Sequence, residues 1–70
     1  MAEIRAEIVA NVWKVTAQPG DTVAAGDTLL ILESMKMEIP VLVEDPGTIV
    51  DILVNEGDVV QEGDLLAVVE

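Results

Sequence analysis

The sequence predicts an all-β domain, because its apolar residues have strand character and its two halves are built alike. The 70 residues are rich in Val, Ile, Leu and Ala, with no Phe or Tyr, and β-branched residues favour strands. Residues 7–33 align without gaps with residues 44–70 at an offset of 37. Internal repetition of this kind indicates a duplicated fold, which we expect to form one domain over residues 1–70.

Six segments separated by turn residues show no helical period and are predicted as strands. In the first of them Ile4, Ala6 and Ile8 alternate with Arg5 and Glu7, as in a strand with one buried face. The predicted strands lie within residues 4–9, 12–17, 28–33, 37–43, 48–54 and 65–70.

Irregular positions occur at matching places in the two halves. Val12 and Val15 stand three positions apart, and so do Ile49 and Ile52, which predicts a bulge or bend in both halves. Pro40 interrupts a predicted strand, so we expect it on a sheet edge or at a bulge.

Gly-Asp steps mark the turns, at Gly20-Asp21, Gly26-Asp27, Gly57-Asp58 and Gly63-Asp64. We expect each glycine to hold a strained backbone conformation and each aspartate to accept a hydrogen bond from a nearby backbone N–H. A calcium site would need dense, alternating oxygen ligands and a closing glutamate. No metal site is therefore predicted. Trp13, whose repeat position holds Val50, is expected to pack or to cover a sheet edge rather than to line a ligand site.

Composition excludes several classes of function. The chain has no Cys or His, which removes disulfides, thiolate nucleophiles, imidazole bases and common metal ligands, so we do not expect an enzyme. The net charge of −11 would repel nucleic acid. No apolar run approaches the length of a membrane helix, and Glu3 stands where a signal peptide would be basic. We expect a cytoplasmic protein without a membrane partner.

The stretch "ESMKMEIP", residues 33–40, places Lys36 between Met35 and Met37 at an expected strand-to-strand turn. We expect Met35 and Lys36 to be the central residues of a tight primed turn, in which both carry positive φ. Adding 37 to residue 36 gives 73 and subtracting it gives −1, and neither lies in the chain. The symmetry mate of this turn is therefore the pair of termini, so the turn should project from the opposite end.

This stretch resembles the modification motif of the biotinyl-attachment domains, the carrier parts of biotin-dependent carboxylases. The resemblance covers nearly the whole chain, including the Gly-Asp turns, "LLILE" and "GTIVDILVNEGDVVQEGDLLAVVE". It implies a flattened antiparallel barrel or sandwich of two similar four-stranded sheets with pseudo-twofold symmetry. It also implies that Lys36 carries biotin in amide linkage and that Met35 and Met37 are recognition neighbours. Ser34 departs from the usual Ala, and the gapless repeat leaves no room for the thumb-like insertion of some carriers.

The function implied by the resemblance is that of a small biotin acceptor and carboxyl carrier, similar to the stand-alone biotinylated proteins of bacteria. Its partners would be a biotin protein ligase and the biotin carboxylase and carboxyltransferase subunits of a carboxylase, and the free chain would be a monomer. Two alternatives stay open. A lipoyl carrier shares the fold and the lysine turn, although lipoyl domains usually show Asp-Lys there. An acidic interaction module would leave Lys36 unmodified.

Overall fold

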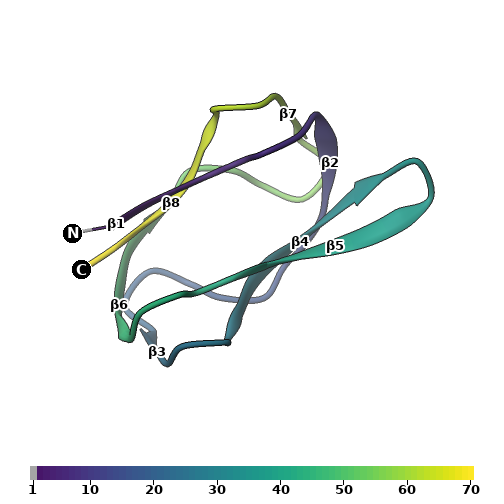
Figure 1. The fold of residues 1–70 in the computed structure, drawn as a ribbon. Coiled ribbons are helices and arrows are strands. Elements are labelled where there is room, and N and C mark those ends of the chain that lie inside the picture. Colours follow the sequence, from purple (N-terminus) through teal and green to yellow (C-terminus); the bar gives the residue numbers. More distant parts are fainter. Residues whose placement is uncertain (1) are drawn as a thin grey trace.

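The computed structural model describes residues 2–70, and this part of the chain contains strands and no helix (Figure 1). The strands are β1 (Ala2–Arg5), β2 (Ala10–Val15), β3 (Thr22–Val23), β4 (Thr28–Ser34), β5 (Met37–Leu42), β6 (Gly47–Ile52), β7 (Val59–Val60) and β8 (Leu65–Val69). The predicted all-β class is confirmed. No helix among these residues could span a membrane.

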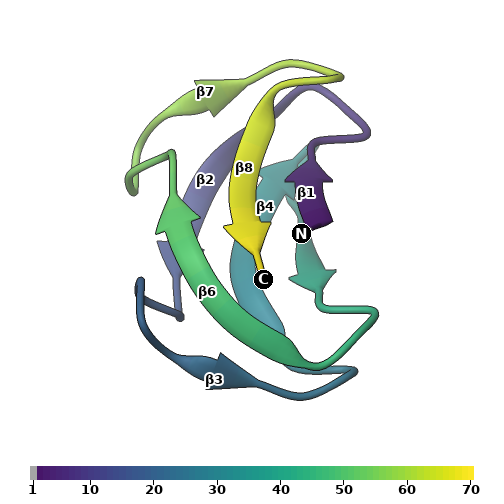
Figure 2. The same cartoon turned by 90° about the vertical axis from the view of Figure 1, so that its left-hand side faces the viewer.

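The strands form two antiparallel four-stranded sheets, in the orders β1-β8-β6-β3 and β5-β4-β2-β7. Figure 2 shows them as two curved layers, with β6 and β8 in front of β2 and β4. The boundaries of β6 lie 37 positions after those of β2, and those of β7 lie 37 positions after those of β3. The predicted sandwich of two similar sheets is confirmed, and the sequence repeat relates one sheet to the other.

The core lies between the sheets and is supplied almost equally by the two halves. It contains no buried polar side chain among the described residues, so its cohesion comes from apolar burial and close packing. The repeat pairs Ala6 with Val43, Val12 with Ile49, Val23 with Val60, Leu29 with Leu66, Leu30 with Ala67 and Leu32 with Val69, and all of these side chains are buried.

The Gly-Asp turns have the predicted construction. The four glycines hold φ values of 90° to 94°, a region that only glycine enters freely. Each aspartate carboxylate accepts a hydrogen bond of 2.8 to 2.9 Å from the backbone N–H three residues earlier. No cluster of metal-ligating side chains occurs in residues 2–70. These aspartates therefore have a structural role in closing the turns.

The irregular positions are also confirmed. The register shifts between Val12 and Lys14 in β2 and between Ile49 and Asp51 in β6, so the bulge occurs in both halves. Pro40 lies on β5, which is an edge strand. There the missing N–H costs no bond to a second neighbour.

Three expectations for the strands and for Trp13 are wrong in whole or in part. The first strand ends at Arg5 rather than residue 9, and Ile8 is 40% exposed. The chain turns away there, since Ala6 exchanges backbone hydrogen bonds with the loop at Gly63 and Asp64. The short strands β3 and β7 lie outside all six predicted segments. Trp13 is 42% exposed on β2, an interior strand of its sheet, so it covers no edge and packs only in part, beside Lys14.

Candidate functional site

The β4–β5 hairpin ends in a two-residue turn formed by Met35 and Lys36. Ser34 and Met37 are the last residues paired across the two strands. Met35 has a φ of 52° and Lys36 a φ of 65°, and they are the only non-glycine residues with positive φ in the described chain. Positive φ at both central positions is what a type I′ hairpin turn requires, and the predicted turn geometry is confirmed.

The hairpin projects from one end of the molecule, while both chain termini lie at the other end (Figure 1). Its base is held by the core, because Leu30 and Leu32 of β4 are buried and Ile39 and Val41 of β5 pack against that core. The tip is thus a protrusion on a rigid support. The position inferred from the repeat, opposite the termini, is confirmed.

The side chains at the tip face solvent. Met35 is 92% exposed and Met37 is 62% exposed, so neither fills a gap in the core. Lys36 is exposed as well, and no hydrogen bond or ion pair joins its amine to residues 2–70. An unpaired amine on a protruding turn can enter the active site of another protein. Exposed methionines beside it offer flexible apolar contacts to that protein.

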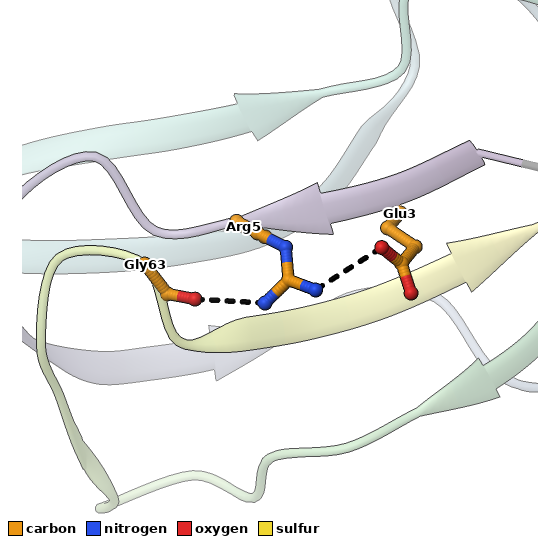
Figure 3. Close-up of polar contacts among 3 residues, drawn as sticks. All are labelled: Glu3, Arg5 and Gly63. Atoms are coloured by element: carbon orange, nitrogen blue, oxygen red, sulfur yellow. Dashed lines mark hydrogen bonds and ion pairs between the residues drawn. The ribbon is translucent and has the colours of Figure 1, made fainter.

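The other two cations of the chain lie in different surroundings. Lys14 is in the middle of β2, with its Nζ 5.3 Å from the ring centroid of Trp13, within the range of a cation–π interaction. Arg5 donates hydrogen bonds to the Gly63 carbonyl and to the Glu3 carboxylate, at 2.9 and 3.0 Å (Figure 3). Within the described residues, Lys36 alone combines a turn position with a free amine.

Two glutamates face each other across the hairpin just below the tip. Glu33 of β4 pairs with Glu38 of β5 in the strand register, and like charges directly opposite are mildly destabilising in a sheet. The signal for this pair in the sequence is the two-residue turn. Glu33 stands two positions before Met35 and Glu38 two positions after Lys36, so a turn centred on Met35 and Lys36 places the two acids opposite each other.

Comparisons with known proteins agree with this fold. The family model described as "Biotin-requiring enzyme" (Biotin_lipoyl) matches residues 1–69. The "Biotinylated protein TB7.3 homolog" of Mycobacterium leprae is 54% identical over 70 residues, which cover 99% of each chain.

Solved structures show the same fold in a much larger protein and in a domain of similar size. The urea carboxylase of Kluyveromyces lactis matches with a TM-score of 0.92 and 39% identity, over 99% of this chain and 6% of that protein. The lipoyl domain of the 2-oxoglutarate dehydrogenase complex of Azotobacter vinelandii matches with a TM-score of 0.80 and 28% identity, over 96% of this chain and 95% of that domain. With the family model matching nearly its whole length, the chain belongs to the biotin/lipoyl attachment family.

Proposed function

We propose that this chain is a biotin carrier in which Lys36 is the attachment residue. A biotin protein ligase joins biotin to Lys36 Nζ by an amide bond, and the attached biotin then carries a carboxyl group between partner active sites. The observation that carries the proposal is the Met35–Lys36 turn, which presents a free amine at the tip of a protruding hairpin. Met35 and Met37 act as recognition neighbours on either side.

The attachment chemistry explains why the amine must protrude. The ligase converts the biotin carboxylate and ATP into biotinyl-adenylate and pyrophosphate. The neutral amine of Lys36 attacks the acyl carbon, AMP leaves with the electron pair of the broken C–O bond, and the amine releases a proton. The adenylate is held inside the ligase, so the lysine has to enter that pocket. The chain supplies the acceptor and its position, and the ligase supplies the catalysis.

The carrier step needs two further enzymes. A biotin carboxylase would carboxylate a ring nitrogen of the attached biotin, and a carboxyltransferase would pass the carboxyl group to its acceptor. The likeness to a segment of a urea carboxylase supports a carboxylase as the partner. ATP-dependent attachment by a ligase supports a cytoplasmic location.

Incubation of the purified chain with biotin, ATP and a biotin protein ligase tests the proposal. We expect intact mass spectrometry to show one added biotinyl group and peptide mapping to place it on Lys36. Lys36→Arg keeps the charge but lacks a primary amine, and it should stay unmodified. Lys14 is the internal comparison, because it is the other lysine of the chain. A group found on Lys14 would contradict the assignment, and chain isolated from its own cells with a lipoyl group instead of biotin would favour the lipoyl alternative.

A further inference from the structure

The outer face of the hairpin sheet carries an apolar stripe behind the turn. Ile31 of β4 lies opposite Pro40 of β5 and Lys14 of β2, and Trp13 occupies the bulge beside Lys14. Leu42 follows two positions after Pro40 on β5, where exposed and partly buried residues alternate, so both point outward. Trp13 is 42% exposed and Leu42 is 48% exposed. We call Trp13, Ile31, Pro40 and Leu42 the outer stripe.

The fold does not require the β5 part of this stripe, Pro40 and Leu42, to be apolar, as the second sheet shows. The repeat offset of 37 gives the equivalent positions of that sheet. Val50 and Val68 are equivalent to Trp13 and Ile31. Glu3 and Arg5 are equivalent to Pro40 and Leu42. The last two equivalents are charged, and they form an ion pair of 3.0 Å along β1 (Figure 3). The same scaffold therefore accepts charged residues where the hairpin sheet has Pro and Leu. Contiguous exposed apolar residues that the fold does not demand mark an interaction surface.

The stripe lies on the sheet whose hairpin ends in Lys36. The facing pair Glu33 and Glu38 stands between the stripe and the turn. A protein that receives Lys36 therefore meets an acidic pair next to the turn and an apolar area beyond it. A complementary surface has basic residues followed by an apolar patch. A second copy of this chain fits poorly, because its net charge is also −11.

We infer that the outer stripe docks against the biotin protein ligase while Lys36 occupies its active site. This inference rests on the proposed function. During attachment the acceptor is a bare lysine side chain, which is short, so the hairpin sheet must come close to the body of the ligase. During carboxyl transfer the same lysine is lengthened by biotin, so the sheet can stand further from the partner enzyme. The ligase is therefore the partner that must approach the hairpin sheet most closely.

Steady-state kinetics of attachment, with the concentration of this chain varied, tests the inference. The double variant Trp13→Thr and Leu42→Thr keeps strand-forming residues but removes two exposed apolar side chains of the stripe. We expect its KM to rise about tenfold, as for the loss of a small binding hot spot, while kcat changes little. The single variant Trp13→Phe, which keeps Leu42 and an aromatic ring at position 13, should have a KM near the wild-type value.

Val50→Thr is the matched control, because Val50 is equally exposed, at 42%, on the equivalent position of the other sheet. Its KM should equal that of the wild type. Urea unfolding establishes that each variant is folded. Leu42→Arg provides a second variant should the double variant fail to fold, since the equivalent position of the fold already carries Arg5.

Several results would overturn the inference. One is an unchanged KM for both the double variant and Leu42→Arg, and another is an equal rise for Val50→Thr. If the stripe binds a different partner, the variants would leave attachment unchanged. They would instead impair carboxylation of the biotinylated chain or abolish a dimer seen by sedimentation. Failure of the proposed function is distinguishable, because the wild-type chain itself would then gain no biotin on Lys36.

Discussion

Lys36 holds a backbone conformation that its side chain does not favour, with a φ of 65° beside the 52° of Met35. An ordinary residue in this conformation destabilises the folded state by roughly 1 kcal/mol or more, whereas Gly or Asn adopts the conformation at little cost. We therefore expect Lys36→Asn and Lys36→Gly to leave the free energy of unfolding unchanged or slightly raised, and to abolish biotin attachment. Urea unfolding of the unmodified proteins at fixed pH and salt measures the first effect.

Lys36→Arg is the control for charge in this experiment, because it keeps the cation and the strained φ. Its stability should match that of the wild type. A loss of more than about 1 kcal/mol in Lys36→Asn, which exceeds the usual effect of a surface substitution, would instead give Lys36 a structural role.

The two methionines of the turn provide a second prediction at this scale. Met35 and Met37 are 92% and 62% exposed, so replacing either with Ala should cost well under the roughly 2 to 5 kcal/mol typical of a buried methionine. Attachment should slow in both variants, because the apolar contacts beside Lys36 are lost. Unfolding free energies and the kcat/KM of attachment, measured on the same samples, separate the two effects. A large stability loss with normal attachment would assign the methionines to the core.

At the scale of single residues, the sequence predicts the lysine turn well and Trp13 badly. The turn follows from the repeat, because residue 36 has no mate within the chain and two flexible apolar residues flank a rare cation. Trp13 sits in a bulge, where the alternation of buried and exposed positions breaks. The local register decides on which side of the sheet the Trp13 ring lies. The residue pattern of the sequence does not indicate that register.

At the scale of the elements, the Gly-Asp turns are closed by hydrogen bonds from the backbone to the aspartate carboxylates. The Asp58 carboxylate accepts a 2.8 Å hydrogen bond from the Asn55 backbone N–H, and its repeat mate Asp21 accepts one of 2.9 Å from Gln18. Asp58→Ala should lower the free energy of unfolding by about 0.5 to 1.5 kcal/mol, the net value of such a bond. Asp58→Asn keeps an acceptor oxygen and should lose less.

Thermal or urea unfolding of both variants checks this, with Asp21→Ala as the matched substitution in the other half. The two Ala variants should lose similar amounts, because the bonds are equivalent. Equal losses for Asp58→Ala and Asp58→Asn would mean that the negative charge, and not the hydrogen bond, holds the turn.

The sequence predicts a strand where the alternation of buried and exposed residues runs over several positions, and it does not reveal shorter strands. β3 and β7 are two residues each, and they exist because they pair with β6 and β2. Two residues show no period, so only tertiary pairing defines such strands. The first strand was predicted too long for a related reason, since Ile8 continues the alternation after the chain has turned at Ala6.

For the whole molecule, charge is the dominant surface property. The chain carries a net charge of −11 within a radius of gyration of 11.0 Å. At 0.01 M salt the Debye length is about 30 Å, so the excess acidic charges repel one another across the whole molecule, whereas at 0.15 M it is about 8 Å. Since unfolding separates the charges, screening should stabilise the folded state.

We therefore expect the free energy of unfolding to rise when NaCl is raised from 10 to about 150 mM. Urea titrations at the two salt concentrations measure it, and NaCl avoids the general stabilisation that sulfate gives by exclusion. KCl should act in the same way as NaCl. A fall in stability with salt would mean that attraction between the few cations and the acids outweighs the repulsion.

The architecture as a whole was predictable because the two halves share one pattern, and an offset of 37 residues relates the strands of one sheet to those of the other. The offset pairs the residues of the two outer faces, but it does not show which of these residues are exposed. Exposure is a property of the packed sheets.

The positions of the chain ends have a consequence for fusion to other proteins. β1 and β8 lie side by side, with Ala2 opposite Val69, at the end of the molecule away from Lys36 (Figure 1). A polypeptide joined at either end would leave from that side, and its linker would act as a tether that keeps clear of the lysine. The same fold can thus work as a free-standing protein or as a small appendage of a very large one, without any change at the turn.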